Sequence, residues 1–287
     1  MSRENVLTRL TDIVTNIRRR LAGSSALERA RPGTDSPLNP TQELFCIWNA
    51  ERLRISLEES RQRFFASYHA LPHGHGGKEF RRFCDLSYQM YRPFCDDTRE
   101  EIDEAYRLHA PMHFLRMLSY DIPMWDDADP VLEALKSLPH ITVIDFGCGL
   151  AHRSRALAEK LLAGGQAVNL VLVDIATVRK PFLLWVGRRT GIPVTFVDCS
   201  AADPLPSLPP AHVCIATDVF EHLHDPMRAL NALHGALLPG GLLVTDVDDH
   251  RAEYMHVSPQ LKAIRDRLAS LHYEELKARR LYRKRID

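Results

Sequence analysis

The spacing of apolar residues changes near residue 140 of this 287-residue chain. Before that point apolar residues recur at helical intervals, and proline- and glycine-rich stretches such as 23–40 and 72–77 interrupt the pattern. The spacing predicts helices over residues 6–21, 41–70, 78–91, 97–118 and 129–137. No strand is predicted before residue 140, so the first part of the chain is expected to be an all-helical segment.

After residue 140, short β-rich runs alternate with helices. Strands are predicted at 141–146, 170–174, 194–197, 213–217 and 242–247, with helices near 152–163, 178–189 and 226–238 between them. A helix at 258–270 precedes two short runs, 273–278 and 281–285, which would add a final pair of strands. This alternation is typical of an α/β fold in which helices cover both faces of a mostly parallel sheet.

Composition and charge exclude several classes of protein. With 45% hydrophobic residues the chain can bury a core, which excludes a wholly disordered protein. Lys+Arg and Asp+Glu are both 37, so no positive field favours nucleic acid, and we expect no nucleic-acid partner. No apolar run approaches the ~20 residues that cross a bilayer, so no membrane span is expected. The cysteines are scattered without a C-x-x-C pair, which favours a cytoplasmic protein with reduced thiols.

The strongest local signal is the run Val143-Ile144-Asp145-Phe146-Gly147-Cys148-Gly149-Leu150-Ala151. A buried strand leads there into a glycine turn and then into a helix. Glycines at the turn let the backbone approach a ligand closely, because no Cβ stands in the way. The next predicted strand ends in an acid, Asp174, which can accept hydrogen bonds from both hydroxyls of a ribose. The pattern therefore predicts a nucleoside site.

Two kinds of cofactor compete for this site. A dinucleotide fingerprint needs a third glycine, but the corresponding position is His152. Asp145, just before the turn, would repel a pyrophosphate, whereas it would orient the ammonium group of an amino acid. S-adenosylmethionine carries that ammonium group and a ribose but no phosphate, so it is the favoured cofactor.

At this point the chain resembles the class I S-adenosylmethionine-dependent methyltransferases, over about residues 130–287. Four motifs carry the resemblance, in order: Asp145-Phe146-Gly147-Cys148-Gly149, Val171-Leu172-Val173-Asp174, Thr217-Asp218-Val219-Phe220-Glu221-His222-Leu223 and Leu238-Pro239-Gly240-Gly241-Leu242-Leu243-Val244. The resemblance implies a seven-stranded, mostly parallel Rossmann-like sheet. It also implies a cofactor domain at 131–287, preceded by a helical cap or substrate segment at 1–130.

The resemblance also implies which residues bind the cofactor: Asp145, Gly147, Cys148, Gly149, Asp174, Ile175, Asp198, Ser200 and Asp218. The acid and glycines of the first motif would hold the methionine end, Asp174 the ribose, and Asp218 would lie beside cofactor and substrate. In two places the sequence departs from the family. Ala151 takes the third small position of the glycine loop, and adenine recognition falls on Asp198 or Ser200 because the register gives Asp198-Cys199-Ser200 after the third strand.

Methyl transfer needs alignment in an apolar site, and needs a general base only when the nucleophile arrives protonated. His222 and His224, after the fourth strand, and His250 are the candidate bases, with His256 further along. Tyr88, Tyr91, Tyr120 and Trp125 are candidates to line the pocket, because aromatic faces attract a sulfonium. A metal site at Asp246, Asp248 and Asp249 matches on ligand type, but an acidic solvated loop explains these residues as well, and no metal is predicted.

Three functions remain open. The first is methylation of a small molecule in specialised metabolism. The second is cleavage of the cofactor's other carbon–sulfur bond, as in an azetidine-2-carboxylate synthase that releases methylthioadenosine from the cofactor alone, or in an aminocarboxypropyl transferase. The third is a non-catalytic partner protein on the same scaffold. The apolar face of helix 6–21 would then dock a partner, although it would equally pack on the enzyme itself or form a homodimer.

Overall fold

The computed structural model describes residues 38–70, 100, 106–107, 114, 117–118, 128–199, 205, 207–250 and 256–286. The chain divides into two compact units, residues 1–73 and 74–287. The functional boundary expected at residue 130 stays a prediction. Within the described ranges, no helix is long and apolar enough to cross a membrane.

In the first unit, the single helix predicted over 41–70 is wrong, because the chain forms two helices, α3 (Pro40–Leu53) and α4 (Leu57–Ala70). Arg54 ends α3 in the left-handed conformation at φ 55°. Ser56 then accepts a hydrogen bond from the Glu59 amide at 3.0 Å, as an N-cap does. No glycine or proline marks this break, so the spacing of apolar residues alone predicted one continuous helix. The predicted helices 6–21 and 78–91 lie outside the described residues.

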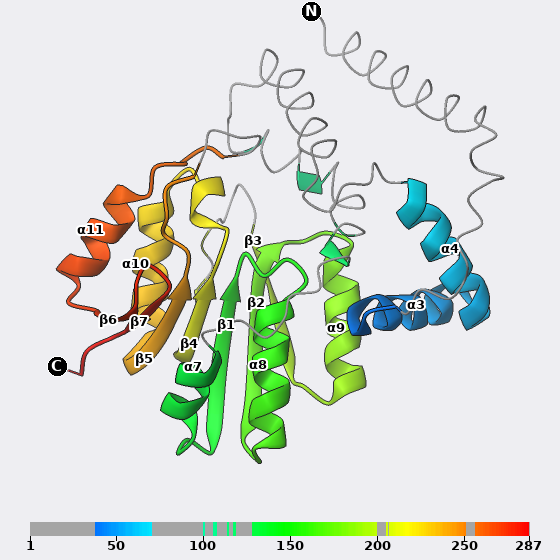
Figure 1. The fold of residues 1–287 in the computed structure, drawn as a ribbon, viewed down its shortest axis with the longest axis horizontal. Helices are drawn as coiled ribbons and strands as arrows, with labels where there is room; N and C mark the ends of the chain where they lie inside the picture. Colours follow the sequence, from blue (N-terminus) through cyan, green and yellow to red (C-terminus); the bar gives the residue numbers. More distant parts are fainter. Residues whose placement is uncertain are drawn as a thin grey trace, which may run out of the picture. The chain divides into compact units, whose positions relative to one another are not determined.

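The second unit contains one sheet of seven strands in the order β3-β2-β1-β4-β5-β7-β6 (Figure 1). The five strands β1 to β5 run parallel, and β7 is antiparallel to both β5 and β6. The strands are β1 (His140–Phe146), β2 (Ala167–Ile175), β3 (Val194–Cys199), β4 (Ala211–Ala216), β5 (Leu237–Thr245), β6 (Glu274–Lys277) and β7 (Leu281–Arg283). This confirms the expected seven-stranded, mostly parallel Rossmann-like sheet.

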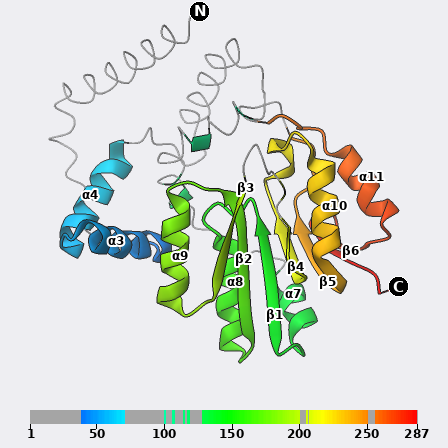
Figure 2. The same cartoon turned by 180° about the vertical axis from the view of Figure 1, so that it is seen from behind.

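Helices cover both faces of this sheet, as Figures 1 and 2 show from opposite sides. The helices α7 and α8 lie on one face and α10 and α11 on the other, while α9 packs against β3 at the edge. Their bounds are α7 (Ala128–Leu135), α8 (His152–Ala163), α9 (Arg179–Thr190), α10 (Pro226–Ala236) and α11 (Lys262–Ser270), and a short 3-10 helix, η2 (Phe220–His222), follows β4.

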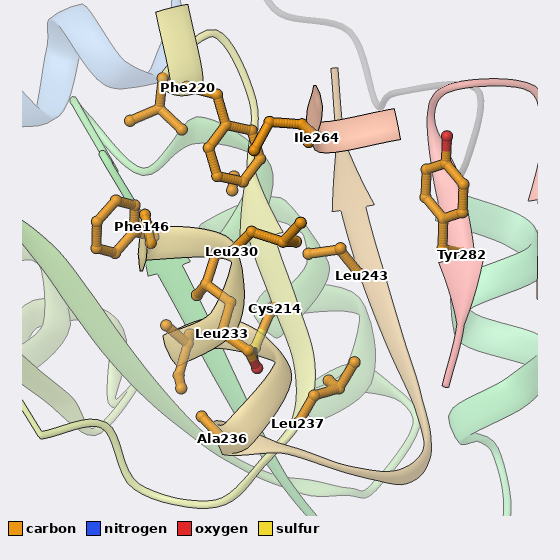
Figure 3. Close-up of a cluster of buried hydrophobic side chains, with 14 of the residues drawn as sticks. Phe146, Cys214, Phe220, Leu230, Leu233, Ala236, Leu237, Leu243, Ile264 and Tyr282 are labelled. Atoms are coloured by element: carbon orange, nitrogen blue, oxygen red, sulfur yellow. Dashed lines mark hydrogen bonds between the residues drawn. The ribbon is translucent and has the colours of Figure 1, made fainter. Parts of the chain in front are cut away.

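A buried hydrophobic cluster fills the space between the sheet and the layer formed by α10 and α11 (Figure 3). Leu230 and Leu233 of α10 and Cys214 of β4 are all fully buried there. Phe220 of η2 belongs to the same cluster and is also fully buried. The segment after β4, which carries the third sequence motif, is therefore anchored in the core at its first helical residue.

The start of β5 differs from its prediction. The helix expected over 226–238 ends at Ala236, and the strand begins at Leu237, so Gly240 and Gly241 lie inside a strand and do not mark the end of a helix. Gly240 adopts φ +76°, and its amide donates to the carbonyl of Lys284 at 2.9 Å. The pairing of β4 with β5 also shifts register near Ala211, an irregularity that a glycine accommodates at little cost.

Candidate functional site

The glycine turn after β1 has the backbone geometry that the sequence indicated. Gly147 and Gly149 adopt φ values of +69° and +54°, in the left-handed region that favours glycine. A Cβ on Gly147 would lie 2.4 Å from Cγ2 of Val219, so the turn also packs closely against the segment after β4. Ala151, the third small position, is left-handed too at φ +54°, and it directly precedes α8. The substitution of alanine for glycine thus keeps the turn at the cost of backbone strain.

Asp174, at the end of β2, is tied directly to this turn. Its Oδ2 accepts a hydrogen bond from the amide of Gly149 at 2.8 Å, and its Oδ1 accepts one from the amide of Ile175 at 2.7 Å. The Cys148 thiol lies 3.8 Å from the same Oδ2, and burial raises its pKa well above the usual range, so the thiol is a neutral donor. The structure therefore brings Asp174, Ile175, Cys148 and Gly149 together, as the sequence suggested.

A partner of Asp174 that the sequence did not reveal is Arg179, in the first turn of α9. Its Nη2 donates to Oδ1 of Asp174 at 3.1 Å, and the two side chains are only 10% and 12% exposed. With Ile175 and Arg179 on Oδ1, the oxygen that faces the glycine turn is Oδ2. These contacts fix the orientation of the carboxylate relative to the turn.

Asp145, at the end of β1, is 6% exposed. Ser154 of α8 donates to its Oδ2 at 2.5 Å. Burial raises the pKa of Asp145 to about 6, although the Ser154 hydrogen bond opposes the shift. A cation placed beside this carboxyl would favour its charged form.

Met117, which precedes α7 in the chain, packs directly against the glycine turn. A Cβ on Gly149 would lie 2.2 Å from Cε of Met117, so this side chain takes the space that the glycine leaves. The backbone carbonyl of Met117 is 3.1 Å from Nε2 of His152, which must be the donor because a carbonyl only accepts. Burial lowers the pKa of His152 to about 4, so the ring is neutral at pH 7. Sequence reasoning missed both residues, because no local pattern reports a contact between segments so far apart.

The residues expected at the adenine end are only partly described. Asp174 and Asp198 are paired across β2 and β3, which places Asp198 beside Asp174. Its carboxylate receives a hydrogen bond from Nζ of Lys180 at 2.6 Å. Asp218 follows β4 with an exposed side chain and φ +53°. Ser200 and the four aromatic candidates, Tyr88, Tyr91, Tyr120 and Trp125, lie outside the described residues.

Two of the candidate bases, His222 and His250, lie beside the same buried glutamate. Oε1 of Glu221 lies 3.7 Å from Nε2 of His222 and 3.7 Å from Nδ1 of His250, and its side chain is 2% exposed. The ring of His256 completes the group, with its centroid 4.7 Å from that of His222 and 5.5 Å from that of His250. We call Glu221, His222, His250 and His256 the histidine cluster. Sequence reasoning named the three histidines and quoted Glu221 within a motif, but it did not foresee that they would meet.

The acidic residues Asp246, Asp248 and Asp249, which follow β5, form ion pairs with arginines. Arg280 pairs with Asp246 and Arg279 with Asp248, and Arg265 donates to both oxygens of Asp249. The arginine side chains hold the pKa values of the last two carboxyls below their usual range. These three carboxylates therefore serve to join the end of β5 to α11 and to the loop before β7.

The sheet order, the left-handed glycine turn and the acid after β2 define the class: the S-adenosylmethionine-dependent methyltransferase fold. The chain belongs to the methyltransferase domain family, which matches residues 124–283.

Several solved structures are similar to this chain at low identity. The [4+2]-cyclase SpnF is 20% identical over 52% of this chain and 60% of its own, with a TM-score of 0.39. An S-adenosylmethionine-dependent methyltransferase from Mesorhizobium loti is 21% identical over 43% and 54%, with a TM-score of 0.33. Coclaurine N-methyltransferase, bound to N-methylheliamine and S-adenosylhomocysteine, is 16% identical over 64% and 57%, with a TM-score of 0.39. The chain spans less than two thirds of each of them, and no curated protein sequence matches it significantly.

Proposed function

We propose that this protein binds S-adenosylmethionine at the glycine turn and transfers its methyl group to a small molecule. The observation that carries the proposal is the hydrogen bond from the Gly149 amide to Oδ2 of Asp174 at 2.8 Å. It joins the turn after β1 to the acid after β2 at the carboxyl edge of the sheet, where ligands of open α/β folds bind.

The residues present fit this cofactor. Gly147 and Gly149 are left-handed, and without a Cβ they let Val219 and Met117 pack directly against the turn. Asp145 is a buried carboxyl whose pKa is raised to about 6, and the ammonium of a bound amino acid would stabilise its charged form. When bound, S-adenosylmethionine supplies an electrophilic methyl group on a sulfonium centre.

The chain's own residues would then have separate tasks. Asp174 accepts hydrogen bonds from the ribose through Oδ2, while Arg179 and the Ile175 amide hold the carboxylate in orientation. Met117, anchored by His152, covers Gly149 and keeps water from this part of the turn. His222 and His250, each beside Glu221, are the groups that would take a proton from an acceptor. The balanced charge of the chain supports a small acceptor over a nucleic acid.

The products formed from methyl-labelled cofactor test this proposal. We expect purified protein to produce S-adenosylhomocysteine and a labelled small molecule when a small-molecule cell extract is supplied, and neither without it. Release of methylthioadenosine from the cofactor alone would overturn methyl transfer and support the cyclase or aminocarboxypropyl-transfer alternative. If neither product forms and the cofactor does not bind, the protein is a non-catalytic member of the family.

A further inference from the structure

We propose that the histidine cluster binds a divalent transition metal, with zinc as the best match, through Glu221, His222 and His256. One donor atom from each of these three residues lies within 4.8 Å of the other two. No part of the cofactor site described above contributes a ligand, so metal binding does not depend on the proposed function.

The donor set matches the metal in kind and in spacing. Two imidazoles and a carboxylate suit Zn²⁺, Fe²⁺ and Ni²⁺, whereas Mg²⁺ and Ca²⁺ prefer oxygen donors. Zinc binds these atoms at about 2.1 Å, which places neighbouring donors about 3.3 Å apart in a tetrahedral site. Oε1 of Glu221 and Nε2 of His222 are already 3.7 Å apart. Shifts of a few tenths of an ångström therefore bring this pair of donors to bonding geometry.

Unsatisfied polar atoms in the cluster point to a cation. Oε2 of Glu221 and Nε2 of His250 are buried without a hydrogen-bond partner among the described residues. A buried carboxylate oxygen without a partner is costly, and an ion bound to Glu221 is one of the recognised explanations for it. Asp218 and Asp246 add negative potential near Glu221. A bound cation would offset the buried charge of Glu221.

Local structure holds these ligands together. Glu221 and His222 lie in η2, whose first residue, Phe220, is fixed in the core. The segment containing His256 is fastened to η2 by the hydrogen bond from the Ser258 amide to the Glu221 carbonyl at 2.9 Å. The His250 amide donates to the carbonyl of Pro259 at 2.8 Å, which ties His250 to the segment just after His256. His250, with Nδ1 beside Glu221, acts as a positioning residue for the carboxylate.

Three protein ligands leave a coordination position open, as in catalytic rather than structural zinc sites. The site neighbours the glycine turn, because Val219, which packs on Gly147, precedes η2. A hydroxyl group of the acceptor, bound at the open position, would have its pKa lowered by the metal. In that arrangement His222 is a ligand and not a base. This role in catalysis, unlike metal binding itself, rests on the proposed methyl transfer.

Metal titration of the untagged, full-length protein tests the proposal without any cofactor. After treatment with a chelator, the protein is titrated with Zn²⁺ by calorimetry and with Co²⁺ by visible absorption, which reports imidazole ligation and geometry. We expect one ion per chain. His256→Ala and Glu221→Gln should each weaken binding at least tenfold. The matched control is His140→Ala, an exposed histidine at the amino end of β1, which should bind as the wild type does.

Folding of each variant is checked by circular dichroism and denaturant unfolding in the presence of chelator. His256→Gln, which keeps a polar side chain, replaces His256→Ala if the latter unfolds. The proposal is overturned if the wild type binds no Zn²⁺ or Co²⁺, or if folded His256 and Glu221 variants bind as tightly as His140→Ala. Because no cofactor is present, failure here leaves the methyltransferase proposal standing, and failure of that proposal leaves the metal site standing.

Discussion

Arg179 and Asp174 form an ion pair in which Nη2 lies 3.1 Å from Oδ1 and both side chains are nearly buried. Breaking a buried pair by removing one partner is costly, because the remaining charge is left uncompensated. We expect Arg179→Met to lower the free energy of unfolding by about 3 kcal/mol.

A double-mutant cycle isolates this pair. Adding Asp174→Asn to Arg179→Met should cost much less than Asp174→Asn costs alone, giving a coupling energy of at least about 1 kcal/mol in denaturant unfolding. Additive effects of the two substitutions would show that the ion pair contributes nothing to stability.

Asp145 makes the stability depend on pH in a definite direction. Its pKa in the folded protein is about 6, above the ordinary 3.8, so its contribution is fully present below pH 3.8 and is lost as the pH rises through 6. Relative to Asp145→Asn, the wild type should lose about 2 kcal/mol of unfolding free energy between pH 4 and pH 7. Parallel curves of unfolding free energy against pH for the two proteins would contradict this assignment.

His152 makes the stability depend on pH in the opposite direction to Asp145. Its pKa in the folded protein is about 4, below the ordinary 6.5, so its contribution is present above pH 6.5 and is lost as the pH falls through 4. Relative to His152→Gln, which keeps a donor for the Met117 carbonyl, the wild type should lose about 3 kcal/mol on acidification from pH 7 to below pH 4. Hydrogen exchange, or ring NMR shifts of His152, would detect a ring that titrates normally and so refute the prediction.

Within the glycine turn, Ala151 is a non-glycine residue in the left-handed conformation, at φ +54°, which is strained for a residue with a Cβ. A left-handed conformation costs a non-glycine residue about 1 kcal/mol, so Ala151→Gly should raise the free energy of unfolding by up to that amount. The control is Ala156→Gly in the interior of α8, which should lower it by about 1 kcal/mol. The same sign for both substitutions in denaturant unfolding would mean that the strain at 151 is relieved elsewhere.

Local patterns in the sequence were enough to predict the sheet and half of the site. The strand, glycine turn and helix from Val143 onward form one continuous segment, and Asp174 follows the next strand, so neighbouring positions in the chain specify both. The contacts that complete the site join distant segments. Met117 packs on Gly149, and the ring of His256 contacts that of His222. Contacts between segments so far apart in the chain leave no periodic pattern in the sequence.

The remaining errors also have physical causes. The break between α3 and α4 relies on a left-handed arginine, Arg54, which carries no turn signature. Gly240 lies in a strand because β5 starts early, and its amide donates to the carbonyl of Lys284, just after β7. This pairing joins segments far apart in the chain, so the local sequence does not predict it.

The most direct test of the account is isothermal titration of the protein with S-adenosylhomocysteine, which binds without turnover. We predict one site per chain and at least tenfold weaker binding by Asp174→Asn, since hydrogen bonds to a charged acceptor contribute about 1.5–3 kcal/mol. Asp266→Asn, an exposed carboxylate paired with Lys262 in α11, is the control and should bind as the wild type does. Undetectable binding of both S-adenosylhomocysteine and S-adenosylmethionine, or binding that Asp174→Asn leaves unchanged, would contradict the account.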